Sequence, residues 1–177
     1  MKNKFKLTAL FALILSAGYY LYSNVAGGRE LAKEKAALLG IAESLNKGAI
    51  SRVDIFYMPM SAESARRMEP EDIFSLPVTL SVKPGTDEAA KLCKAIKNTR
   101  LTPMHFGLDM REGFIAYDAA NKEIGRVIMS SAKDGYINGL PCHFKGPLKR
   151  TLMDLAAPDR YKGLGWKEKI FILLLEL

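Results

Sequence analysis

The stretch "FIAYDAANKEIGRVIMSSAKDGYINGLPCHF", Phe114 to Phe144, decides the fold of this chain. It holds short runs of β-branched and aromatic residues, and turn-forming residues separate these runs, as is typical of antiparallel strands joined by hairpins. The runs are "FIAYD", "IGRVIMSS" and "YINGLPCHF". The stretch therefore predicts a meander, in which each strand pairs with the strand that follows it.

Further strands are expected before this meander. The segment "MHFGLDM" (104–110) is predicted to be extended and to turn at "REG" (111–113) into the next strand. Earlier in the chain, "AISRVDIFYMP" (49–59) and "VTLSV" (78–82) have the β-branched and aromatic composition of strands. The sheet should therefore include strands from the first half of the chain as well.

Amphipathic helices flank the strands. In three segments, apolar residues recur with the spacing that places them on one face of a helix. These stripes are Leu31, Leu38, Ile41 and Leu45; Ala89, Leu92, Cys93 and Ile96; and Leu148, Leu152 and Leu155. A shorter helix is expected at Pro70, because proline followed by acidic residues suits a first helical turn. The sequence thus predicts an α+β fold, with a mainly antiparallel sheet packed against about three helices.

The first 26 residues have the organisation of an export signal. Three lysines within the first six residues form a basic end, an apolar run follows, and three tyrosines between positions 19 and 22 close it. This order keeps the basic end in the cytoplasm and moves the rest across the membrane. We favour a retained transmembrane anchor through residues 5–22, because the tyrosines suit a membrane interface. The alternative is a signal peptide cleaved near residues 16–18 or 25–27, which would leave a periplasmic or secreted protein.

The remainder is expected to form a single α+β domain of residues 29–177, joined to the first segment by flexible glycines at 27–28. The formal net charge is +7, and three of these charges lie in the N-terminal segment, which leaves +4 interleaved with acidic residues. Such scattered charge argues against nucleic-acid binding. The apolar run "IFILLLEL" (170–177) is too short to span a bilayer. We expect it to be a buried strand, with a docking helix or a membrane-contacting tail as alternatives.

Cys93 and Cys142 are predicted to be structural. The helical stripe places Cys93 on a buried face, and alternation along "LPCHF" places Cys142 on the apolar face with Leu140 and Phe144. Two cysteines of an exported domain commonly form a disulfide. We therefore expect a Cys93–Cys142 disulfide, with two buried free thiols as the alternative.

No residue is expected to be catalytic. His143 is the strand neighbour of Cys142, so the two side chains point to opposite faces and do not form a dyad. His105 is expected on the polar face of its own strand. The two cysteines and two histidines lack the spacing of a structural metal site, and the sequence contains none of the common nucleophile, phosphate or dinucleotide motifs. We expect neither a metal nor a cofactor.

Two basic segments are the candidate binding sites. In "RYKGLGWK" (160–167), aromatic and basic side chains surround two glycines, a composition that suits an exposed loop for an acidic or aromatic partner. A solvated connector with one buried tryptophan is the alternative. The second segment is a pair of arginines beside "MEPED". The candidate residues are Arg66, Arg67, Arg160, Tyr161, Lys162 and Trp166.

These features favour a protein of the cell envelope that acts by binding. The expected location is the inner (cytoplasmic) membrane, with the domain outside the cytoplasm. The expected partner is another envelope protein, bound by an inhibitor or immunity-type protein or by an accessory subunit of a membrane complex. The alternative is a small envelope hydrolase whose catalytic residues the sequence does not reveal.

Overall fold

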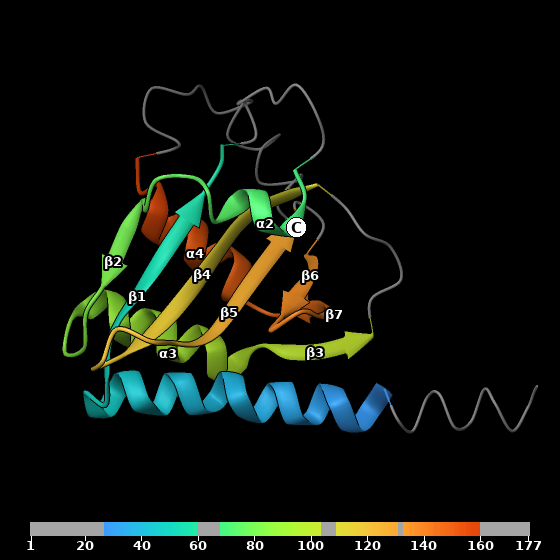
Figure 1. Ribbon diagram of the computed structural model, residues 1–177, viewed down its shortest axis with the longest axis horizontal. Coiled ribbons are helices and arrows are strands. Elements are labelled where there is room, and N and C mark those ends of the chain that lie inside the picture. The colour runs from blue at the N-terminus through green and yellow to red at the C-terminus, as the bar shows by residue number, and fades with distance from the viewer. Residues whose placement is uncertain (1–26, 60–67, 104–108, 131–132, 160–177) are drawn as a thin grey trace, which may run out of the picture.

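A computed structural model describes residues 27–59, 68–103, 109–130 and 133–159. Within them, seven antiparallel strands form one sheet in the order β2-β1-β4-β5-β6-β7-β3 (Figure 1). The strands are β1 (Ile50–Tyr57), β2 (Leu80–Val82), β3 (Arg100–Pro103), β4 (Met110–Asp118), β5 (Glu123–Ser130), β6 (Asp134–Ile137) and β7 (Leu140–Lys145). The described residues also include an N-terminal helix at 27–47, α2 (Pro70–Ile73), α3 (Asp87–Asn98) and α4 (Leu148–Ala156).

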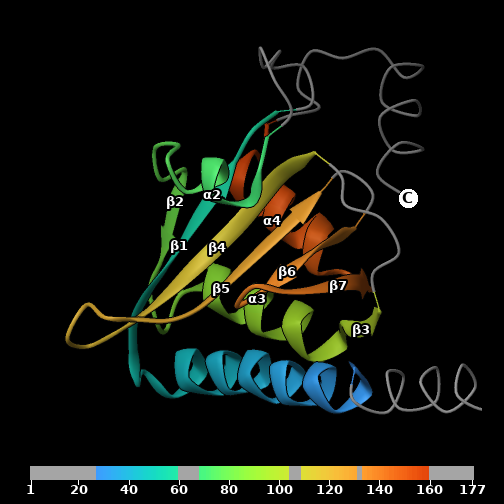
Figure 2. The same cartoon turned by 45° about the vertical axis from the view of Figure 1, so that its right-hand side comes forward.

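Different helices cover the two faces of the sheet. α3 and α4 lie on one face, with the N-terminal helix beside α3, whereas α2 lies on the other (Figures 1 and 2). We call these the helix face and the α2 face. The strands contribute alternate residues to each face: Val53, Ile55, Phe114 and Val127 belong to the main core cluster on the helix face. Phe56, Ile115 and Ile128 belong to a smaller cluster on the α2 face.

The amphipathic stripes predicted from the sequence are the faces that the helices bury. Leu38, Ile41 and Leu45 of the N-terminal helix are at most 4% exposed, and Leu92 and Ile96 of α3 are fully buried. Leu148 and Leu152 of α4 are also fully buried, while Leu31 and Leu155 pack at the margin of the same cluster. The short helix expected at Pro70 is present as α2, with Pro70 in its first turn. The α+β fold with an antiparallel sheet is thereby confirmed.

The ends of α3 are held by side chains from outside the helix. Thr86 accepts a hydrogen bond on Oγ1 from the backbone N–H of Ala89, which caps the first turn. At the other end, Thr99 donates from Oγ1 to the carbonyl of Ala95 and accepts from the N–H of Leu148, the first residue of α4. One buried hydroxyl thus joins the end of α3 to the start of α4.

The turn predicted at "REG" (111–113) is wrong. These residues lie inside β4, where Gly113 pairs with Phe56 of β1 and with Ile128 of β5. A Cβ atom at Gly113 would lie 2.5 Å from the carbonyl oxygen of Val127, so the close approach of β5 requires glycine here. Glycine therefore marks tight strand packing and not a turn.

Three other features differ from the sequence expectation. The segment "YINGLPCHF" is not one strand, because Asn138 and Gly139, with φ of 50° and 88°, form a two-residue hairpin between β6 and β7. β3 was not anticipated, although it pairs with β7 along its whole length. The glycines at 27–28 are helical and do not form a loop.

Some expectations concern residues outside those described. The anchor at 5–22, the extended segment at 104–108, His105 within it and the apolar run at 170–177 all lie there. Among the described residues, no helix has the length and apolar character needed to cross a membrane.

Candidate functional site

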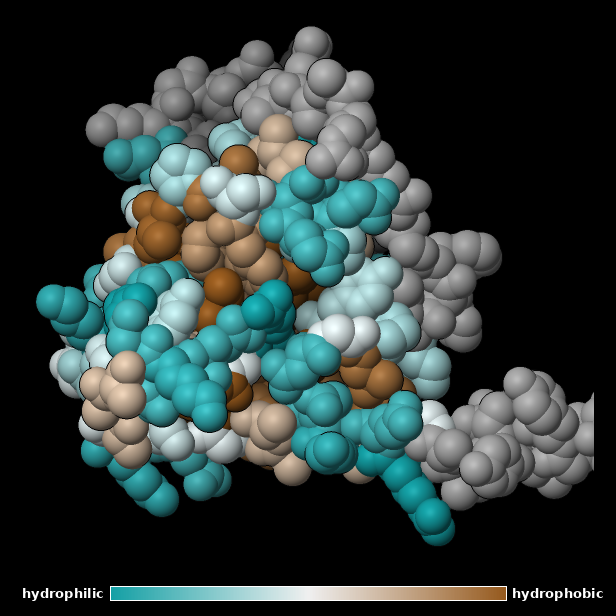
Figure 3. Space-filling model, viewed as in Figure 1, coloured by the Kyte–Doolittle hydropathy of each residue, from teal (hydrophilic) through white to brown (hydrophobic). Residues whose placement is uncertain are grey.

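The α2 face of the sheet carries a cavity of about 470 Å³ between α2, β5 and the β6–β7 hairpin. Its walls combine apolar and charged side chains, which are Glu69, Glu71, Phe74, Glu123, Arg126, Ile128, Tyr136 and Asn138. Phe74, Ile128 and Tyr136 belong to the smaller apolar cluster or pack against it. Figure 3 looks onto this side of the molecule and shows apolar surface bordered by hydrophilic residues. A concave apolar surface with a few convergent polar groups is the usual form of a binding site.

Arg126 is the central charged group of this cavity. Its Nε and Nη2 atoms donate to the two carboxylate oxygens of Glu123, at 2.5 Å and 2.6 Å, which makes a bidentate ion pair. The guanidinium carbon also lies 5.3 Å from the ring centroid of Phe74, within the range of a cation–π contact. The hydrogen bonds that Arg126 donates to Glu123 raise the pKa of Arg126 above its ordinary value. One edge of the Arg126 guanidinium thus binds the carboxylate of Glu123 in the same strand.

The hairpin at Asn138 fixes the rim of the cavity. The Asn138 side chain accepts on Oδ1 from the backbone N–H of Arg126, at 3.0 Å. Its Nδ2 donates to Glu34 of the N-terminal helix, at 2.7 Å. A single amide side chain therefore connects the β6–β7 turn, strand β5 and the N-terminal helix, which holds the cavity wall against the rest of the fold.

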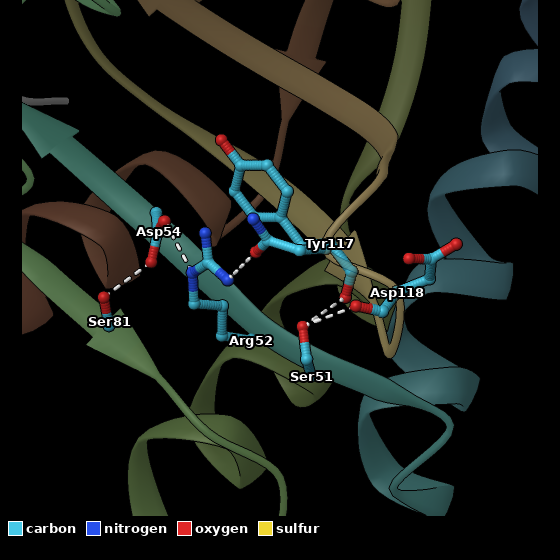
Figure 4. A network of polar contacts seen from close by, with 7 residues as sticks. Ser51, Arg52, Asp54, Ser81, Tyr117 and Asp118 are labelled. Atoms are coloured by element: carbon cyan, nitrogen blue, oxygen red, sulfur yellow. Dashed lines mark hydrogen bonds and ion pairs between the residues drawn. The ribbon is translucent and has the colours of Figure 1, made fainter.

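A polar network extends along β1 beside this site (Figure 4). Asp54 is only 5% exposed, and it accepts hydrogen bonds from Arg52 Nε at 2.9 Å and from Ser81 Oγ at 2.5 Å. The Arg52 guanidinium lies over the ring of Tyr117, 4.2 Å from the centroid, and also contacts Asn121. These contacts join β1 to its neighbours β2 and β4. The network therefore supports the pairing of these three strands.

A third polar group occupies the other end of the α2 face. His143 Nδ1 lies 2.7 Å from Asp134 Oδ1, and both side chains are partly buried. Thr102 of β3 is the cross-strand partner of His143 on its other side. Residues directly opposite on antiparallel strands share a face, so Asp134, His143 and Thr102 form one row across three strands. A carboxylate that orients a histidine beside a hydroxyl is a familiar arrangement in acyl-transfer enzymes.

The cysteines occupy the main core cluster, as their spacing predicted. Both are free thiols in the structure and both are buried. Cys93 lies 3.1 Å from the carbonyl oxygen of Ala42, to which its thiol donates. Burial raises the pKa of Cys93, and it raises the pKa of Cys142 to about 12. Burial thus disfavours the thiolate form of both cysteines, and the Cys93–Cys142 disulfide stays a prediction.

The six binding residues predicted from the sequence all lie outside the described residues. They are Arg66, Arg67, Arg160, Tyr161, Lys162 and Trp166. The residues that the structure brings together instead are Glu69, Glu71, Glu123 and Arg126, which the sequence analysis did not select. Two features of the sequence could have indicated this site. They are Arg126 within the strand pattern "EIGRVI" and the Asn-Gly pair of the adjacent hairpin.

The described residues contain no group of three or more histidine, cysteine or acidic side chains that could hold a metal ion. Comparisons of the chain with protein-family models, with curated proteins and with solved structures found no match.

Proposed function

We propose that the protein acts by binding another protein of the cell envelope through the α2 face of its sheet. The observation that carries this proposal is the difference in cover between the two faces. Three helices bury the helix face, whereas among the described residues only the four-residue α2 lies on the other. A partly covered apolar surface with a charged border is typical of a protein-interaction site.

The cavity beside α2 gives this surface a defined recess. Aromatic and arginine side chains are common at the energetic centres of protein interfaces, and here Phe74, Tyr136 and Arg126 lie together. The N-terminal segment 1–26 would hold the domain at the outer side of the inner membrane, next to its partner. Residues 160–167 would supply further basic and aromatic contacts. An inhibitor of the immunity type and an accessory subunit of a membrane complex both fit this arrangement.

Site-specific photo-crosslinking tests the proposal. The photoreactive residue p-benzoylphenylalanine would replace Ser75, which is exposed directly after α2. Irradiation of intact cells should yield a defined covalent adduct with one envelope protein, which mass spectrometry would identify. The matched control replaces Glu43, an exposed residue of the N-terminal helix. An adduct of equal yield at both positions, or none at position 75, would contradict binding through the α2 face.

The row of Asp134, His143 and Thr102 favours a second candidate, a small envelope hydrolase. In such an enzyme Asp134 would orient His143, which would act as a general base toward Thr102 or a water molecule. The discriminating variants are His143→Ala and Asp134→Asn, tested by complementation in cells with protein levels measured in parallel. Binding centred on the cavity beside α2, whose lining does not include these residues, predicts that activity is kept at normal protein abundance. Loss of activity at normal abundance, with Thr102→Ala inactive and Thr102→Ser active, would favour the hydrolase.

A further inference from the structure

We infer that the cavity beside α2 accepts a basic side chain, a lysine or an arginine, from the partner protein. This inference rests on the proposed function and adds the chemistry of recognition to it. Three features of the cavity support it: its charge, the pairing of Arg126 and its apolar floor.

The cavity is acidic within a basic protein. Three carboxylates, Glu69, Glu71 and Glu123, line it together with one guanidinium, that of Arg126. The chain as a whole has a formal charge of +7. These carboxylates favour a cationic group in this recess, and such local complementarity selects one orientation of a partner.

Arg126 does not make the cavity a site for anions. The Nε and Nη2 atoms of its guanidinium donate to the two oxygens of Glu123, and the guanidinium carbon lies over the ring of Phe74. An incoming carboxylate or phosphate would find this guanidinium already paired with Glu123, and it would also meet Glu71, whose charge acts on Arg126. Both effects oppose an anionic ligand.

The floor of the cavity suits the aliphatic part of a basic side chain. Ile128 is 4% exposed and lies at the base, with Phe74 and Tyr136 beside it. Lysine and arginine have apolar stems that pack on such surfaces while their charged ends remain near carboxylates and solvent. The exposed ring of an aromatic residue also attracts cations. A volume of about 470 Å³ leaves room for such a side chain and part of the backbone that carries it.

Three small probes test this inference on the full chain in detergent. Nα-acetyl-lysine amide carries the proposed group, Nα-acetyl-norleucine amide has the same stem without charge, and Nα-acetyl-glutamate amide has the opposite charge. Chemical shifts of the backbone amides of Ile128 and Tyr136 would be followed during titration by NMR. We expect the lysine probe to shift both amides with an affinity about threefold to fivefold above that of norleucine, which is the size of an exposed ion pair. The glutamate probe should bind least.

Two variants locate the effect. Glu71→Gln should lower the affinity for the lysine probe to about that of the norleucine probe, because one carboxylate of the rim is lost. Glu43→Gln removes an exposed carboxylate of the N-terminal helix and should leave the affinity unchanged. Equal binding of lysine and norleucine, tighter binding of glutamate, or no shift at Ile128 and Tyr136 would overturn the inference.

The outcome is separable from that of the proposed function. A crosslinked envelope protein at position 75 without lysine binding would leave the interface in place and overturn the basic side chain alone. Lysine binding without any crosslinked protein would keep the specificity of the cavity and contradict its use in protein binding.

Discussion

Lys35 of the N-terminal helix donates a hydrogen bond from Nζ to the carbonyl oxygen of Ile96, near the end of α3, at a distance of 2.9 Å. The same ammonium group contacts the carbonyl of Thr99, the residue that follows the helix. The last carbonyls of a helix lack partners within it and carry partial negative charge. A cation from another helix therefore satisfies the end of α3.

Replacement of Lys35 by methionine should lower the free energy of unfolding by about 1–2 kcal/mol, because the carbonyls at the end of α3 lose a charged donor. Methionine retains much of the apolar stem. Urea unfolding followed by circular dichroism would measure the change. Lys33→Met, at an exposed position of the same helix, is the control and should be close to neutral. Equal losses in the two variants would show that Lys35 does not cap α3.

Asp54→Ala should destabilise the protein by about 2–4 kcal/mol, because a buried acceptor for Arg52 and Ser81 is lost. The comparison is Glu43→Ala, which removes a carboxylate 4.0 Å from Lys47 in an exposed pair. That change should cost less than about 0.5 kcal/mol. Thermal and chemical unfolding of the two variants would give the values. A small effect at Asp54 would mean that the network in Figure 4 contributes little to the stability of the sheet.

Two glycines should respond to alanine in opposite directions. A Cβ atom at Gly135 would lie 1.9 Å from the carbonyl oxygen of Ile128, so Gly135→Ala should cost about 3 kcal/mol through strain between β5 and β6. No atom lies within 4 Å of a Cβ atom at Gly40, in the N-terminal helix, so Gly40→Ala should stabilise by up to about 1 kcal/mol. Melting temperatures that change in the same direction would contradict this packing.

The reduced protein should protect both of its thiols. Burial raises the pKa of Cys93, and it raises that of Cys142 to about 12. Iodoacetamide at pH 8 should therefore modify the native protein slowly and the urea-unfolded protein fully. The raised pKa of Cys142 also predicts that stability falls as pH rises from about 9 to 12, because the unfolded thiol ionises first. A Cys142→Ala variant should lose that part of the alkaline dependence.

Protein isolated from cells without reductant tests the predicted disulfide. If Cys93 and Cys142 pair after export, the protein denatured without reductant will contain no thiol that alkylates, and its mass will be two hydrogens below the dithiol form. Closing a loop of about 50 residues would add roughly 3–4 kcal/mol of stability in the chain-entropy model. Alkylation of both cysteines under these conditions would contradict the pairing and leave two buried free thiols.

Residues 1–26 should keep the protein in the membrane fraction. We expect resistance to extraction by high salt and by alkaline carbonate, and access of external protease to the domain only from outside the cytoplasm. The intact mass of the purified protein is the decisive measurement. A mature N-terminus between residues 17 and 28 would replace the anchor with a cleaved signal peptide.

Local patterns in the sequence predicted where helices and strands form better than they predicted which strands pair. The stripe of Leu38, Ile41 and Leu45 predicted a helix face because helical periodicity can be recognised within a short segment of the chain. The pairing of β3 with β7 joins Leu101 to Phe144, across more than forty residues, and no local pattern encodes it. "RLTP" is also short and contains proline, so its strand character comes mainly from pairing with β7.

The candidate site was harder to predict for the same reason. The cavity combines Glu71 of α2 and Phe74, the residue after it, with side chains of β5 and β6. Their proximity therefore depends on the completed sheet. Likewise, Asp134 meets His143 only because the Asn-Gly turn sets the register of β6 and β7. Strand alternation is enough to predict that His143 lies on the face opposite Cys142, but no local pattern indicates the carboxylate of Asp134 beside it.

The N-terminal helix has a mechanical consequence for the whole protein. Its 21 described residues make a rod of about 30 Å, and Glu34, Lys35, Leu38 and Ile41 fasten this rod to the domain. Residues 27 and 28 belong to the helix, so the rod begins at residue 27 without the expected glycine loop. A displacement or rotation of residue 27 would be passed along the rod to the domain through these contacts, and the rod would set both the height and the aim of the proposed binding surface.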